Sequence, residues 1–158
     1  MGVGMDIIVA RDSHIPGIME LLTELLQFHR DIDPRFPLNE TAPSALDEHL
    51  RDILSDKDSI VFITLKVDKI VGFSIARIMK SVPIWQREYF GLIDTVMVSS
   101  DYRRQDVGTK MLNLILEWFA SRDIDMVELS VAAGNQVGRS FWKKHGFREY
   151  LHRLYLKI

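Results

Sequence analysis

The spacing of apolar and polar residues predicts alternating strands and helices along the chain. Between residues 15 and 28, apolar side chains recur every three or four positions, which is the period of an amphipathic helix. The segment 59–79 is rich in β-branched residues and is interrupted once, which is typical of a two-stranded hairpin. The other elements expected in this half are a strand over 6–10, a proline-rich loop over 30–44 and a helix over 44–54.

The second half of the chain follows a different order. Its expected elements are a loop over 80–91, a strand over 92–98, a helix over 108–121, a strand over 126–131, a helix over 135–146 and a strand over 150–158. When a helix connects two neighbouring strands of a sheet, the strands lie parallel and the crossover is right-handed. The pattern therefore indicates an α/β chain.

Composition narrows the class of protein. The chain has 158 residues, of which 47% are hydrophobic and 27% are charged, and its net charge is -2. This length fits one domain, and no excess of basic residues favours nucleic acid. No apolar run approaches the roughly 20 residues of a membrane span, and the first residues resemble neither a signal nor a transit peptide. We therefore expect a cytoplasmic protein with a single domain over 1–158, and neither a membrane nor nucleic acid as a partner.

Missing residue types exclude further chemistry. The chain contains no cysteine, which excludes a disulfide framework, thiolate metal ligands and a cysteine nucleophile. The five histidines show no spacing typical of metal ligands, so no metal site is expected.

The segment DYRRQDVGTKML, residues 101–112, combines positive charge with a glycine at a helix start. A turn between a strand and a helix directs free backbone N–H groups and the positive end of the helix dipole to one spot. Arg103, Arg104 and Lys110 add positive charge there, and Gly108 leaves the backbone accessible. The segment matches neither the Walker loop nor the dinucleotide fingerprint. By itself, it fits an anion site and an ordinary basic surface turn equally well.

Two motifs resemble those of the GNAT superfamily of acyl-CoA-dependent N-acyltransferases. The stretch VSSDYRRQDVGTKML is similar to the cofactor motif (Q/R)xxGx(G/A), with Arg103 in the first position, Gly108 in the last and Asp106 in place of the first glycine. The second motif, an asparagine followed by an aromatic pair and Gly-Phe, is matched by Asn135 and the FW and GF pairs after it. The resemblance covers about residues 92–150.

This resemblance implies a fold and a donor. It implies an α/β fold with a central mixed, mostly antiparallel sheet flanked by helices, and acetyl-CoA as the acyl donor. The strand backbone near Val98 would pair with the pantetheine arm, and the turn after it would cradle the pyrophosphate. The residues that the resemblance assigns to the cofactor are Val96, Met97, Val98, Arg103, Arg104, Gln105, Asp106, Val107, Gly108, Thr109, Asn135 and Trp142.

The implied activity is transfer of an acetyl group to a primary amine of a small molecule or peptide. A proton acceptor is needed, because only about one part in 10³ of an alkyl ammonium is deprotonated at pH 7. Asp94, in an otherwise apolar strand, is the leading catalytic candidate, and Glu88 is the second. The alternative is that Asp94 lies on the solvated side of the strand or at a bulge. Without a cysteine, we expect direct attack in a ternary complex, with a backbone N–H near Val98 polarising the thioester carbonyl.

Two residues depart from the family pattern. A carboxylate at Asp106, about 5 Å from a phosphate, would cost between about 0.8 and about 3 kcal/mol, unless it points to solvent, pairs with Arg104 or caps the helix. Trp142 stands where the family commonly has a tyrosine that protonates the leaving thiolate, which leaves water, Tyr150 or Tyr155 for this role. The rival interpretation is a catalytically impaired acyl-CoA-binding or interaction module. The resemblance is also compatible with a homodimer.

Overall fold

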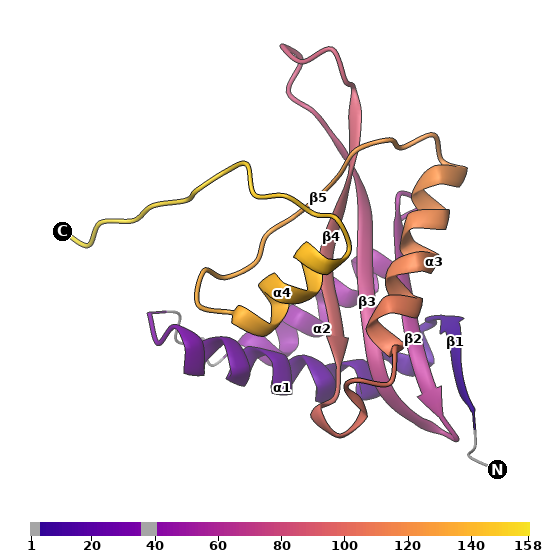
Figure 1. Cartoon of the computed structure of the whole chain (residues 1–158). Helices are drawn as coiled ribbons and strands as arrows, with labels where there is room; N and C mark the ends of the chain where they lie inside the picture. Colours follow the sequence, from indigo (N-terminus) through magenta and orange to yellow (C-terminus); the bar gives the residue numbers. More distant parts are fainter. Residues whose placement is uncertain (1–3, 36–40) are drawn as a thin grey trace.

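The computed structural model describes residues 4–35 and 41–158 (Figure 1). Its elements in chain order are β1 (Met5–Val9), η1 (Asp12–His14), α1 (Ile15–Ile32), α2 (Ala42–Ser55), β2 (Ser59–Lys66), β3 (Lys69–Lys80), β4 (Tyr89–Val98), η2 (Ser100–Tyr102), α3 (Val107–Ser121), β5 (Val127–Leu129) and α4 (Gln136–Lys144). In the described ranges, none of the helices combines the length and hydropathy needed to cross a bilayer. The loop expected over 30–44 includes residues 36–40, which lie outside the described residues.

One sheet organises the fold. Its strand order is β1-β2-β3-β4-β5. Neighbouring strands from β1 to β4 pair antiparallel, whereas β4 and β5 are joined through α3 and pair parallel. The mixed, mostly antiparallel sheet flanked by helices is therefore confirmed, together with the parallel pair that the strand-helix-strand pattern predicted.

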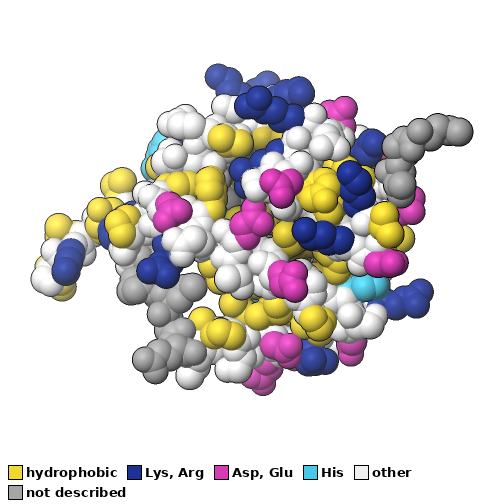
Figure 2. Space-filling model, turned by 90° about the horizontal axis from the view of Figure 1, so that it is seen from below, with side chains coloured by type: hydrophobic (Ala, Val, Ile, Leu, Met, Phe, Trp, Pro, Cys, Tyr) yellow, Lys and Arg dark blue, Asp and Glu magenta, His cyan; other side chains and the backbone are white. Residues whose placement is uncertain are grey.

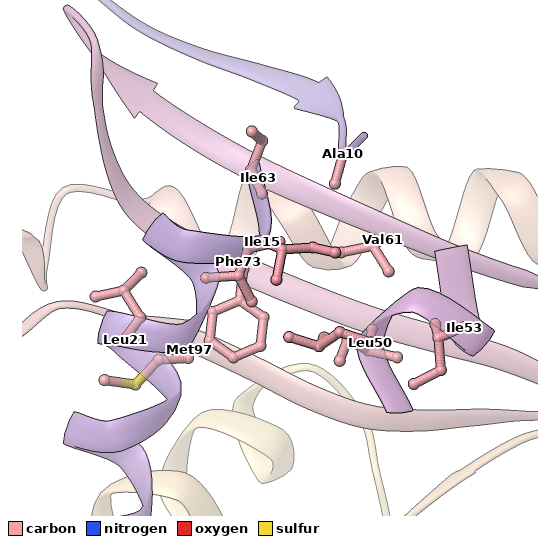
Figure 3. Close-up of a cluster of buried hydrophobic side chains, with 11 residues drawn as sticks. Ala10, Ile15, Leu21, Leu50, Ile53, Val61, Ile63, Phe73 and Met97 are labelled. Atoms are coloured by element: carbon pink, nitrogen blue, oxygen red, sulfur yellow. The ribbon is translucent and has the colours of Figure 1, made fainter. Parts of the chain in front are cut away.

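Helices cover both faces of the sheet. On one face, Ile15 of α1 and Leu50 of α2 pack in a cluster with Phe73 of β3 (Figure 3). On the other face, α3 buries Leu112 and Phe119 in a second cluster. Helix α4 adds aromatic side chains to this second cluster. Each helix therefore has an apolar stripe of period 3.6, and this stripe packs against one side of the sheet.

The sheet opens between β4 and β5. Strand β5 pairs with β4 only over the register from Gly91↔Val127 to Ile93↔Leu129. Immediately after this, β4 contains a bulge: Ile75 of β3 faces Thr95 and the next residue of β3 faces Ile93, which leaves Asp94 as the extra residue. A bulge bends its strand and increases the local twist. Residues 94–98 of β4 thus continue beside β3 while their other edge carries no ladder to β5.

The strand predicted over 150–158 is wrong for this structure. These residues form neither a helix nor a strand, and Figure 1 shows them leaving the body of the molecule after α4. The hydroxyl of Tyr150 donates a hydrogen bond to Glu128 Oε2 at 2.9 Å, which is a side-chain contact with β5 and not a ladder. Alternation along the sequence predicts the strand conformation, but a strand also needs a partner edge, and the pattern contains no information about that partner.

Candidate functional site

The open edge of β4 ends at the turn that leads into α3. Val96 and Met97 pack on opposite faces of the sheet, one with each apolar cluster, so the backbone of this segment is held in the plane of the sheet. The other side of the segment pairs with β3, from Ser74↔Val96 to Gly72↔Val98. A fixed backbone with one unpaired edge is the surface to which an extended amide chain can add as a strand.

The turn after this edge has an unusual backbone. Arg104 and Asp106 both have left-handed conformations, with φ of 61° and 60°. Asp106 is the N-cap of α3, and its side chain makes no capping hydrogen bond. Capping by the Asp106 side chain is therefore wrong, and the first N–H groups of α3 are left to other acceptors. The family's glycine at this position has a physical reason, since a left-handed residue costs glycine nothing and most other residues about 1 kcal/mol or more.

Charges around the turn are mixed. The side chains of Arg104, Gln105 and Lys110 are exposed. Arg103, however, donates from Nε to the carbonyl oxygen of Val98 at 3.1 Å, and its guanidinium lies 5.8 Å from the centre of the Phe28 ring on α1. Figure 2 views the molecule from the side of this turn and shows Lys and Arg side chains interspersed with Asp and Glu. Arg103 thus ties the end of β4 to the turn and to α1.

Gly108 allows α3 and α4 to approach each other. A Cβ atom on Gly108 would lie 3.4 Å from the Phe141 ring of α4 and 3.9 Å from Val98. The sequence indicated that Gly108 leaves the backbone accessible to a ligand. The structure shows that Gly108 also permits close packing between α3 and α4, the two helices that carry the motifs.

The side chain of His145, at the end of α4, joins the same two helices. Its Nδ1 lies 2.9 Å from the carbonyl oxygen of Phe141, and its Nε2 lies 3.2 Å from Thr109 Oγ1. A carbonyl oxygen only accepts, so Nδ1 carries the proton, and in the neutral ring Nε2 accepts from the Thr109 hydroxyl. The sequence patterns did not single out His145, which the structure places as the C-cap of α4. Its position directly before the Gly-Phe pair of the second motif was the available signal.

The other motif residues of α4 have structural contacts. Asn135 is the N-cap of α4, and its Oδ1 accepts from the N–H of Gly138 at 2.9 Å. Trp142 packs edge-on against Phe141 and Phe147, with ring centroids 4.9 Å and 5.2 Å away. An indole in this packing provides no acid for a leaving thiolate.

Asp94 lies at the bulge, at the point where β5 leaves β4. Its side chain is 29% exposed, and its Oδ2 lies 3.6 Å from Nη1 of Arg77 on β3. Burial raises the pKa of Asp94, while the charges of Arg77 and of His49 on α2 oppose that shift. Asp94 therefore combines a place at a bulge beside the open edge with a pKa that burial raises, a combination that is frequent at functional sites.

Glu88 does not lie near Asp94 and the open edge of β4. It precedes β4 and lies six positions before Asp94, roughly 20 Å along the strand. Its backbone oxygen accepts from the N–H of Ser81 at 2.7 Å, which closes the hairpin between β3 and β4. Of the two catalytic candidates, the structure places only Asp94 beside the open edge.

Comparison with known proteins identifies the family. A sequence model described as the acetyltransferase (GNAT) family matches residues 21–147. The chain belongs to the GNAT acetyltransferase family. Comparison with curated proteins found no match. The GNAT family uses acetyl-CoA as its donor, which confirms the donor predicted from the sequence.

Solved structures show the same fold. A tetramutant of the BH1408 protein from Bacillus halodurans is 19% identical, with a TM-score of 0.87, over 97% of this chain and 99% of that chain. A predicted acetyltransferase with acetyl-CoA from Clostridium acetobutylicum is 18% identical, with a TM-score of 0.80, over 98% and 96%. The aminoglycoside N-acetyltransferase AAC(6')-Iy in complex with CoA is 16% identical, with a TM-score of 0.77, over 100% and 97%. At these identities, the likeness establishes the GNAT fold.

The geometry fits the GNAT donor. The pantetheine arm contains amide groups, and the edge over 94–98 offers backbone groups without a ladder partner on one side. A pyrophosphate requires N–H donors, and the turn before α3 leaves those donors without a side-chain cap.

Proposed function

We propose that the protein is an acetyl-CoA-dependent N-acetyltransferase that acts on the primary amine of a small molecule or a peptide, by direct attack in a ternary complex. The observation that carries this proposal is the course of β4. The strand loses its β5 partner at Asp94 and then leads, with one edge unpaired, to the uncapped start of α3.

Backbone groups of this chain would hold the donor. Residues Val96, Met97 and Val98 would pair with the pantetheine arm, and the N–H groups of 104–109 would bind the pyrophosphate. When bound, acetyl-CoA supplies an acetyl group on a thioester, whose carbonyl a backbone N–H near Val98 would polarise.

Asp94 would receive the acceptor amine. The Asp94 side chain is 29% exposed, and its ionised carboxylate would attract an alkyl ammonium. The carboxylate can then accept the proton directly or through one water as the nitrogen attacks. The charge of Arg77 opposes the rise in the pKa of Asp94 that burial causes, which favours the ionised carboxylate.

The α4 motif contains no acid that could protonate the leaving thiolate. Trp142 packs among aromatic rings, and the Tyr150 hydroxyl is already engaged with Glu128. A free thiol has a pKa near 8.5, so the thiolate can leave and take its proton from water. This feature favours a second candidate, a GNAT protein that binds acyl-CoA with little turnover.

The acceptor is proposed by class only. Several proteins of the same fold are named aminoglycoside N-acetyltransferases, which supports a small amine as the acceptor. A peptide amine fits the same carboxylate equally well. The cytoplasmic location stays a prediction of the sequence.

Two measurements on the purified protein test this function. Calorimetric titration with acetyl-CoA should give micromolar binding, and a thiol-release assay with a panel of primary amines should give turnover that Asp94→Asn removes while binding is kept. Asp101→Asn, an exposed aspartate in η2, is the matched control. Binding without release of thiol for any amine supports the module, and absence of binding at millimolar acetyl-CoA overturns both candidates.

A further inference from the structure

A basic side chain stands beside the carboxylate that would receive the acceptor amine. Arg77 lies on β3, and its side chain is 31% exposed. Ile75, two positions earlier, packs in the cluster with α1 and α2, so the alternation of a strand places Arg77 on that same face of the sheet. Its Nη1 lies 3.6 Å from Asp94 Oδ2. A positive and a negative group therefore lie side by side at the bulge.

The guanidinium of Arg77 has hydrogen-bonding capacity left over. An arginine carries five N–H donors in one plane and a permanent positive charge. The Nε atom of Arg77 is buried and has no hydrogen-bond partner among the described residues. The pair with Asp94, at 3.6 Å, is longer than a hydrogen bond. Buried donors are normally paired, and part of this side chain is accessible, so a ligand can supply the missing acceptor.

The charges around this pair leave that acceptor to a ligand. His49 of α2 is exposed, and its charge acts on Asp94 in the same direction as that of Arg77. Asp56, the C-cap of α2, is the other carboxylate on which the charge of Arg77 acts. Its two oxygens already accept hydrogen bonds, from the Ser59 hydroxyl at 2.6 Å and from a backbone N–H at 3.0 Å.

An acceptor of both charges complements this arrangement. In an amino acid, the ammonium and the carboxylate are joined through a single carbon atom, so they can reach two side chains that lie side by side. The ammonium would bind Asp94, and the carboxylate would bind the planar fork of Arg77, which suits such a group. An acceptor with only positive charge, in contrast, would meet a carboxylate whose charge Arg77 offsets, and Arg77 itself would repel it.

We propose that the acceptor is a free amino acid, held with its α-amine at Asp94 and its carboxylate at Arg77. This inference rests on the proposed function and narrows its acceptor. Asp94 takes one proton from the ammonium, directly or through a water. The nitrogen lone pair then forms the N–C bond as the C–S bond of the thioester breaks, and the second proton passes through water to the thiolate. Arg77 determines specificity and takes no part in these bonds.

Matched acceptors test the inference. Thiol release from acetyl-CoA is measured with the standard amino acids other than cysteine, and with the corresponding amino acid amides, in which a neutral group replaces the carboxylate. The amide has the more acidic ammonium and therefore more free amine at neutral pH, so intrinsic reactivity favours the amide. We expect kcat/KM of the preferred amino acid to exceed that of its amide at least tenfold. Turnover of amides or of an aminoglycoside, without turnover of amino acids, overturns the inference and leaves the proposed function standing.

Variants of Arg77 assign the preference to this side chain. Arg77→Gln should lower the ratio of kcat/KM between acid and amide about 10- to 100-fold, mainly through KM, because hydrogen bonds to a charged group are lost. Any effect on Asp94 is common to both acceptors and cancels in the ratio. Arg77→Lys keeps the charge without the fork and should restore part of the ratio. Arg122→Gln removes an arginine paired with Asp58 after α3 and is the control. An unchanged ratio in Arg77→Gln overturns the inference.

Binding gives a readout that needs no turnover. Amino acids and their amides are titrated calorimetrically into the protein in the presence of CoA. Heat with an amino acid but not with its amide, lost in Arg77→Gln, supports the inference. If such binding is found while no amine releases thiol, acetyl transfer is overturned and the amino acid site stands. A protein that neither binds nor acetylates any amino acid overturns the inference.

Discussion

The Nε2 atom of His145 lies 3.2 Å from the Oγ1 atom of Thr109, which joins the end of α4 to the first turn of α3. Thr109 belongs to the segment whose backbone N–H groups would bind the pyrophosphate. A hydrogen bond at this point restricts the turn from the side of α4. The contact of the His145 ring with the tilted Phe141 ring, at 4.5 Å between centroids, restricts the imidazole. His145 is therefore a positioning residue for the turn.

We expect His145→Ala to weaken binding of acetyl-CoA about fivefold, because one intramolecular hydrogen bond contributes roughly 1 kcal/mol. Isothermal titration calorimetry measures this effect. His29→Ala, at an exposed histidine of α1, is the control and should bind as tightly as the natural protein. Equal affinity of the His145 variant would show that the turn keeps its shape without this bond.

Asp106 combines backbone strain with an unfavourable charge, and two substitutions separate them. Asp106→Gly should raise thermal stability by up to about 1 kcal/mol, because glycine takes a φ of 60° without a steric penalty. It should also tighten acetyl-CoA binding about fourfold, the effect of removing a solvated carboxylate near the phosphates. Asp106→Asn removes the charge while it keeps a residue that tolerates left-handed angles. It should therefore tighten binding without the gain in stability, and unchanged binding in both variants would place the carboxylate away from the phosphates.

A buried hydroxyl offers a test of the packing beneath α3. Thr64 is fully buried in β2, and its Oγ1 has no hydrogen-bond partner in the described part of the chain. Thr64→Val keeps the shape and removes an unsatisfied polar atom, so we expect a gain of about 1 kcal/mol and a rise in Tm of roughly 2–4 °C. Differential scanning calorimetry measures both. The control is Thr23→Val on α1, where the hydroxyl donates to the Met19 carbonyl at 2.9 Å, and this variant should not be stabilised.

The sequence predicted the elements that depend on local periodicity. The helix expected over 108–121 is observed as Val107–Ser121, because its apolar stripe specifies both the helix and its buried face. The strand edge and the turn were instead implied by the resemblance of the two motifs to the GNAT family. The helix follows from spacing along the chain and requires no knowledge of its partner.

The features that escaped prediction are relationships between distant elements. The sequence offered a bulge at Asp94 only as an alternative, because the register between β3 and β4 that creates it is specified by no local pattern. The contact between Thr109 and His145 depends on how α4 crosses α3. Residues 150–158 show the same limit, since their alternation predicts a strand but no local pattern specifies the partner edge that a strand needs.

The pH dependence of acetyl transfer should report Asp94. Burial raises the pKa of this carboxyl, and Arg77 is the largest influence in the opposite direction. The ionised carboxylate is the form that accepts a proton, so kcat/KM should fall as the pH decreases through the pKa of Asp94. Removal of the opposing charge in Arg77→Gln should raise that pKa further and move the acid limb of the profile to higher pH, whereas Arg77→Lys should shift it less. Asp94→Asn should lower kcat/KM by about 10²–10⁴ and abolish this limb. A profile that stays unchanged in the Arg77 and Asp94 variants would assign the proton transfer to another group.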